Sequence, residues 1–171
     1  MQLNSRKMNK NLKLLSLDDV LRHVAAFEGF RPRPYRCPAG VLTIGYGHTQ
    51  GVMPSDCVTK EQAFDLLRSD FLLCQSYILN KFALNDCMNS NQIYALTDFV
   101  FNLGFGTLLG STISNTLVDY HNATPSTISQ YDSDIVNTLL KYCRYRKNGK
   151  LVVSSGLQKR RQWEASLFLS S

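Results

Sequence analysis

The residues with the clearest chemical potential lie between Phe27 and Thr49, where one carboxylic acid precedes a glycine-rich stretch. Glu28 follows Val24 by four residues and Leu21 by seven, so a helix here would carry Glu28 on its apolar face. A poorly hydrated carboxyl has a raised pKa, which suits a general acid near neutral pH. Such a residue can equally be a structural ion-pair partner for one of three arginines, Arg144, Arg160 or Arg161.

The helix that would carry Glu28 has clear start and stop signals. Ser16 suits an N-cap, with Asp19 three residues on as its reciprocal partner. Gly29 suits the end of the helix, and the prolines at 32 and 34 forbid its continuation. We therefore expect this helix to end at the acid.

The pattern changes to strand between residues 35 and 49. Val41, Thr43 and Tyr46 suit strands, and the interspersed glycines suit tight turns. We expect a small antiparallel hairpin or a three-stranded sheet that carries Thr43 close to Glu28.

The rest of the chain is typical of helices. Thr59 with Gln62 forms a second capping box and opens a helix of about five turns. Asn148-Gly149 is a hairpin-turn dipeptide, and residues 121–132 read as a polar linker. The sequence thus indicates an α+β protein with a small and a larger helical lobe, and a polymer would lie between them. The further helices are expected at 91–103, 111–120, 134–143 and 157–169.

Several motifs together resemble phage-type lysozymes, the endolysins of glycoside hydrolase family 24. Cys37 follows Glu28 by nine positions and Thr43 follows Cys37 by six, which is the active-site spacing of that family. The likeness extends from residue 16 to 169. The matching segments are Phe27-Glu28-Gly29, residues 43–49, Phe101-Asn102-Leu103-Gly104, Ser111-Thr112 and residues 156–168.

The resemblance implies a lysozyme-like α+β fold in a single domain over residues 16–171. Its small hairpin lobe would occupy about 30–58 and its helical lobe about 80–171. Residues 1–15 would form a flexible extension.

The resemblance also implies hydrolysis of the β-1,4 bond between N-acetylmuramic acid and N-acetylglucosamine in bacterial peptidoglycan. Glu28 would protonate the leaving oxygen and Thr43 would help hold the water. The family usually has aspartate where this chain has Cys37. In one interpretation Cys37 acts as base or nucleophile, with its thiolate form favoured by Arg33 and Arg36. In a second, Cys37 only fills space and the enzyme is slower. In a third interpretation the protein binds the wall without hydrolysis.

Four further residues are predicted by the resemblance to contact the sugar chain. Asn102 has an amide that both donates to and accepts from an N-acetyl group. The other three are Phe101, Thr49 and Ser111.

Other polar residues of the motifs are expected to be structural. The resemblance implies that His48 pairs with Asp70 rather than acting as a base. Arg160 and Arg161 are expected to serve packing, and Trp163 to lie beside the buried stripe of the last helix.

Composition limits the remaining possibilities. The chain has 19 basic and 13 acidic side chains, a net charge of +6, which favours an anionic partner. The five cysteines lack a framework spacing and are expected to be reduced, and we predict no metal or other cofactor. We expect a monomer that binds peptidoglycan, without a signal peptide or membrane span, released from the host cytoplasm by a holin-like route. A basic nucleic-acid-binding protein is a weaker alternative, because no nucleic-acid motif is present.

Overall fold

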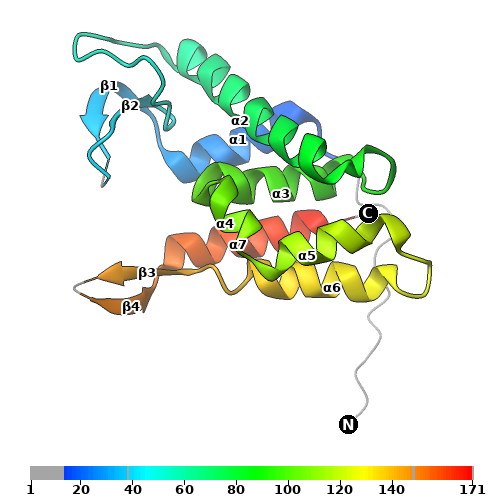
Figure 1. The fold of residues 1–171 in the computed structure, drawn as a ribbon. Coiled ribbons are helices and arrows are strands. Elements are labelled where there is room, and N and C mark those ends of the chain that lie inside the picture. Colours follow the sequence, from blue (N-terminus) through cyan, green and yellow to red (C-terminus); the bar gives the residue numbers. More distant parts are fainter. Residues whose placement is uncertain (1–13, 38, 148, 171) are drawn as a thin grey trace.

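The structure is a computed structural model that describes residues 14–37, 39–147 and 149–170. It is an α+β arrangement in which two small hairpins project from one side of a helical body (Figure 1). The predicted extension at 1–15 lies almost entirely outside the described residues. The elements are α1 (Leu17–Glu28), β1 (Arg31–Arg36), β2 (Leu42–Gly45), α2 (Lys60–Phe82), α3 (Ser90–Leu103), α4 (Phe105–Leu109), α5 (Thr112–Asp119), α6 (Ile128–Leu139), β3 (Arg144–Lys147), β4 (Lys150–Val153) and α7 (Ser155–Phe168), with 3₁₀ turns at Leu84–Asp86 and Tyr120–Asn122.

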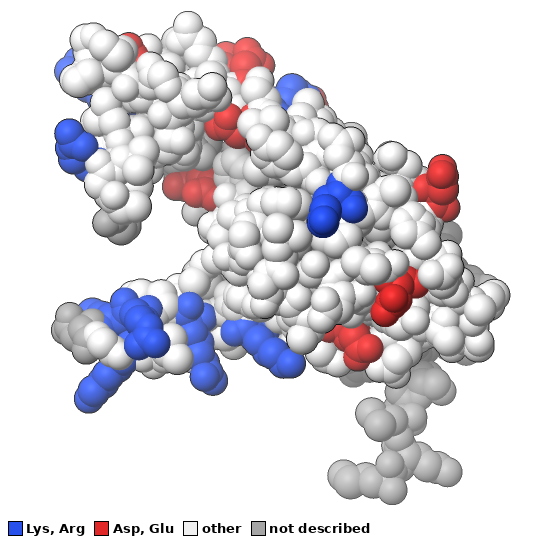
Figure 2. Space-filling model, viewed as in Figure 1, with Lys and Arg blue, Asp and Glu red and all other residues white. Residues whose placement is uncertain are grey.

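The two hairpins, β1–β2 and β3–β4, project on the same side of the molecule (Figure 1). The space-filling view shows the surface hollowed between them, with acidic side chains on the inner wall (Figure 2). The long helix α2 leads from the small lobe to the helical body, as the sequence predicted.

Local signals set the position of Glu28. The Ser16 hydroxyl accepts from the Asp19 backbone N–H at 3.2 Å, which fixes the start of α1. Gly29, at a φ of 74°, ends the helix, and its N–H donates to the Ala25 carbonyl. A residue with a side chain rarely adopts such a φ, so this glycine directs the chain sharply from α1 into β1.

The small hairpin starts earlier than the strand pattern indicated. β1 begins at Arg31 and includes Pro32 and Pro34, which were predicted only to stop the preceding helix. Both prolines lie in a register irregularity between Arg31 and Tyr35, where neither has a paired residue in β2, so their missing N–H groups remove no regular ladder bond. On the other side of β1, the Val58 N–H donates to the Pro32 carbonyl at 3.0 Å. The sheet is a two-stranded hairpin, and a single bridge joins Ile44 to His48.

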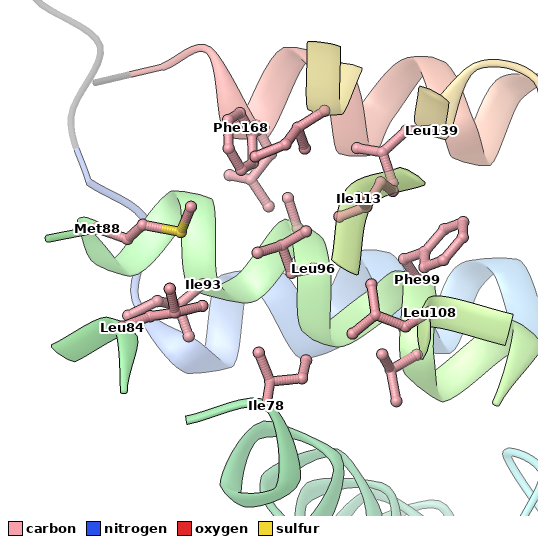
Figure 3. Packing of buried hydrophobic residues seen from close by; sticks show 14 of the residues in the cluster. Ile78, Leu84, Met88, Ile93, Leu96, Phe99, Leu108, Ile113, Leu139 and Phe168 are labelled. Atoms are coloured by element: carbon pink, nitrogen blue, oxygen red, sulfur yellow. The ribbon is translucent and has the colours of Figure 1, made fainter. Parts of the chain in front are cut away.

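Helix α3 forms the centre of the core. It is buried along most of its length and packs chiefly against α7 on one side and α2 on the other. Side chains from the surrounding helices converge on Leu96 and Phe99, including Ile78, Leu108, Ile113, Leu139 and Phe168 (Figure 3). The core therefore belongs to the helical lobe, and the hairpins are carried on its surface.

Two predictions for the region after α5 were wrong. Helix α6 runs from Ile128 to Leu139 rather than from Asp134 to Cys143, so five of the twelve residues of the predicted linker belong to it. Ile128 and Tyr131 pack against the core, and the Tyr120 hydroxyl donates to Asp132 at 2.6 Å. These tertiary contacts stabilise a first turn whose composition alone is typical of a loop.

Candidate active site

Glu28 is both paired with an arginine and open to the cleft. Its Oε1 accepts from Arg160 Nη1 at 2.6 Å, while 23% of its side chain remains exposed. Oε2 lies 3.8 Å from the point where a Cβ on Gly47 would stand, so Gly47 lies in ordinary contact distance of the carboxylate. The two roles that the sequence left open, ion-pair partner and acid at a cleft, are thus combined in one residue.

Arg160 connects three helices at this point. Its Nε and Nη2 donate to the two oxygens of Asp98 at 2.9 and 2.7 Å, and Nη1 donates to Glu28. Burial opposes the arginine's charge, but Asp98 and Glu28 outweigh that effect and raise the pKa of Arg160. The guanidinium is therefore a permanent cation that fixes one carboxylate oxygen and leaves the other to the cleft.

Glu28 stands between two hollows. One, of about 340 Å³, lies toward α2 and α3, and the other, of about 500 Å³, runs along β1. Together they form a groove with the acid at its middle. A larger hollow of about 840 Å³ between α1, α2 and Tyr46 is not lined by Glu28. The first hollow is lined by Glu28, Gly47, Thr49, Gln50, Asp70, Leu73, Cys74, Phe101 and Asn102.

Three of the four predicted sugar-contact residues lie in this groove. Thr49, Phe101 and Asn102 line the same hollow as Glu28. Arg161 Nη2 donates to Asn102 Oδ1 at 3.0 Å. Because a guanidinium only donates, this contact fixes which end of the amide is oxygen and leaves the amide nitrogen for a ligand carbonyl.

Ser111, the fourth residue, is placed elsewhere. Its hydroxyl donates to the Leu108 carbonyl at 2.7 Å, and it lines a separate hollow of about 300 Å³ with Thr112, Thr138 and others. The structure does not bring Ser111 together with Glu28.

Cys37 and Thr43 lie together in the β1–β2 turn region. Hydrogen bonds from the backbone N–H groups of Ala39 and Val41, and then from the Thr43 side chain, lower the pKa of the Cys37 thiol. The Thr43 hydroxyl has a single hydrogen, which it donates either to the Cys37 sulfur or to the Val41 carbonyl 3.0 Å away. The turn thus favours a thiolate at Cys37.

The prediction that neighbouring arginines favour the Cys37 thiolate was wrong. Arg33 and Arg36 do not lower the pKa of Cys37; the hydrogen bonds of the turn do. Arg36 instead donates to the Gly40 carbonyl at 2.7 Å and so supports the turn.

The predicted pairing of His48 with Asp70 is confirmed. Nδ1 lies 2.8 Å from Asp70 Oδ2, and Nε2 lies 2.8 Å from the Gln50 carbonyl. Both ring nitrogens are engaged by protein acceptors, which leaves neither for a substrate. His48 therefore joins the hairpin lobe to α2.

Five lining residues of the first hollow were not among the predicted site residues, and two of them, Leu73 and Cys74, lie on α2 beyond Asp70. They follow Asp70 by three and four positions, so they share its face of α2. Since Asp70 was predicted to point toward the small lobe, this periodicity was the signal that could have found them. Burial and the neighbouring charge of Asp70 raise the pKa of Cys74 to about 11, so this thiol stays neutral.

Comparison with known proteins assigns the chain to the phage lysozyme family, whose model, described as "Phage lysozyme", matches residues 25–164. An endolysin of Acyrthosiphon pisum secondary endosymbiont phage 1 is 33% identical over 150 residues, covering 86% of this chain and 93% of the relative. A SAR-endolysin of Pseudomonas phage phiKMV is 32% identical over 157 residues, covering 92% and 90%.

Solved structures agree with this assignment. The muramidase domain of SpmX from Asticaccaulis excentricus superposes with a TM-score of 0.74 at 28% identity, covering 92% of this chain and 97% of that domain. The active form of the P1 phage endolysin Lyz gives a TM-score of 0.66 at 27% identity, covering 88% and 82%. The predicted family and lysozyme-like fold are confirmed, and the chain is a member of a family of peptidoglycan-directed glycoside hydrolases.

Two kinds of feature are absent from the described residues. No helix among them is long and apolar enough to cross a membrane. The same residues hold no group of three or more His, Cys, Asp or Glu side chains arranged to bind a metal ion.

Proposed function

We propose that this protein is an endolysin-type muramidase that cleaves the β-1,4 bond between N-acetylmuramic acid and N-acetylglucosamine in bacterial peptidoglycan. The observation that carries the proposal is Glu28 at the middle of an open groove, held by Arg160 through one oxygen only. Family membership supplies the substrate class. Release from the producing cell is part of the same proposal, by a holin-like route through its membrane.

In this mechanism Glu28 gives its proton to the leaving glycosidic oxygen as the bond from the anomeric carbon breaks. The thiolate of Cys37 acts at the other side of the sugar ring, as base toward a water or as nucleophile. Thr43 holds the water or the thiolate in place. The net change is the addition of one water across the bond, and both forms of the step require an ionised Cys37.

Substrate positioning follows from the groove. Phe101 offers a ring for contact with a pyranose, and Thr49 offers a hydroxyl. Asn102, oriented by Arg161, donates its amide N–H to the carbonyl of an N-acetyl group. None of these contacts requires a metal.

The decisive experiment is digestion of purified peptidoglycan followed by detection of the new reducing end. Glu28→Gln keeps the shape and removes the proton donor, and we expect it to lower the rate by about 10² to 10⁴. Lys81→Gln, a surface substitution far along α2, is the matched control and should retain wild-type activity.

Wall binding separates the two candidate functions. If the wild type sediments with walls but releases no reducing ends, the protein is a non-hydrolytic binder of the same fold. Absence of the carboxylate usual at position 37 is the feature that would favour that result.

A further inference from the structure

The positive charge of this protein originates in one segment. Residues 135–163 carry eight of the 19 basic side chains and no acid, whereas the rest of the chain has eleven basic and 13 acidic side chains. Five of the eight lie on or beside the β3–β4 hairpin and form no ion pair within the described part of the chain. They are Lys141, Arg144, Arg146, Lys147 and Lys150.

The hairpin presents these cations on both of its faces. Directly paired residues of an antiparallel ladder share a face, and here Arg144 pairs with Val153 and Arg146 with Leu151. The other face carries the pair Lys147 and Lys150, together with Tyr145 and Val152. All eight strand residues are exposed, so the hairpin is an arm with side chains available all round.

The arm borders the groove that contains Glu28. It projects on the same side as β1–β2, and Figure 2 shows Lys and Arg gathered over it along one side of the hollow. β1, across the hollow, exposes Arg31, Arg33 and Arg36. The two rims of the groove, β3–β4 and β1, are therefore basic, whereas its lining includes the carboxylates of Glu28 and Asp70.

We propose that the β3–β4 arm binds the carboxylates of the peptide stems that hang from the muramic acid sugars. This inference rests on the proposed function, and it assigns the arm a substrate contact outside the groove. Uncharged sugars are not repelled by the acidic lining of the groove. Stem carboxylates are repelled by that lining and attracted to the basic rims. Exposed Leu151 and Val153, at 61% and 51%, offer apolar contact to the alanine side chains of a stem.

The distribution of charge favours stems over a membrane surface. A flat anionic bilayer would contact one face of the hairpin and leave the cations of the other in water. Short stems that branch from a strand in the groove reach both faces. The arm is thus better matched to a branched, flexible anion than to a plane.

Binding can be tested independently of cleavage in a Glu28→Gln background. The probe is immobilised glycan strands with intact stems, and the same strands after an amidase has removed the stems. We expect Lys147→Gln with Lys150→Gln to weaken binding to stem-bearing strands about three- to tenfold, as for two exposed charge contacts. Binding to stripped strands should not change.

The matched control is Lys60→Gln with Lys81→Gln, which removes an equal number of exposed positive charges from α2. It should leave binding unaltered to stem-bearing and to stripped glycan strands. Equal weakening on stripped strands, or none on stem-bearing strands, would overturn the proposal. So would a loss confined to vesicles of phosphatidylglycerol and phosphatidylethanolamine, which would assign the arm to membranes. Failure of the muramidase proposal would instead show as absent reducing ends from the wild type.

Discussion

In the proposed mechanism, Cys37 takes the place of a second carboxylate. Its thiol lies in a turn whose backbone N–H groups, with Thr43, lower its pKa from an ordinary value of 9.0. An aspartate at this position would ionise readily because of its intrinsic acidity. The turn promotes ionisation of Cys37 by hydrogen bonding instead.

The pH dependence of activity tests this role. If the thiolate is the active form, activity rises with pH as Cys37 ionises, at a pH below 9. Cys37→Asp should keep activity and move the rising limb to acid pH, because aspartate ionises near pH ~4. Initial rates of reducing-end release across pH would locate the limb in each variant.

Cys37→Ala completes the series and should lower the rate about a hundredfold or more, since no group remains to take the proton. Equal rates for the Asp and Ala variants would show that position 37 has no chemical role. Folding of each variant is checked by its urea unfolding midpoint.

At the scale of elements, His48 connects the hairpin lobe to α2. Its two ring nitrogens meet Asp70 and the Gln50 carbonyl. Gly45, three residues before His48, packs closely against α2, and a Cβ on Gly45 would lie 2.9 Å from the Ala63 Cβ. The small lobe is therefore held on α2 by a polar contact and a close backbone approach.

His48→Asn should lower the free energy of unfolding by about 1–2 kcal/mol, because at least one of these hydrogen bonds is lost. Activity per folded molecule should stay near the wild-type value. Urea unfolding and reducing-end assays on the same preparation measure both quantities. A large loss of activity with unchanged stability would instead make His48 part of the chemistry.

Elements whose signals are local were predictable from the sequence. Ser16, Thr59 and Gly29 act through bonds within a few residues, and the structure has all three as expected. The start of α6 was missed because Ile128 and Tyr131 gain their stability from the distant core. The position of Ser111 also depends on the fold around it: the turn before α5 points its hydroxyl at the Leu108 carbonyl, and Ser111 and Thr112 both line the separate hollow.

At the scale of the whole molecule, one buried ion cluster connects α1, α3 and α7. Arg160 is 4% exposed and Asp98 is fully buried. Two buried charges are stable only as partners, so removal of one leaves the other without compensation.

Asp98→Asn should therefore cost about 3 kcal/mol of unfolding free energy. Asp18→Asn is the control: Asp18 pairs with Arg68 at the surface, where the loss should stay below about 1 kcal/mol. Urea denaturation of both variants gives the comparison. Similar small losses from the two substitutions would show that the buried cluster contributes little to stability.

The contact between Arg160 and Glu28 joins residues 132 positions apart in the chain. On a ribosome that adds about 5–20 residues per second, the nascent acid waits roughly 7–26 seconds for its guanidinium partner to be made. Until then α7 is not available to dock, and Glu28 lacks its contact with Arg160. The order of translation thus delays assembly of the groove until α7 has been made.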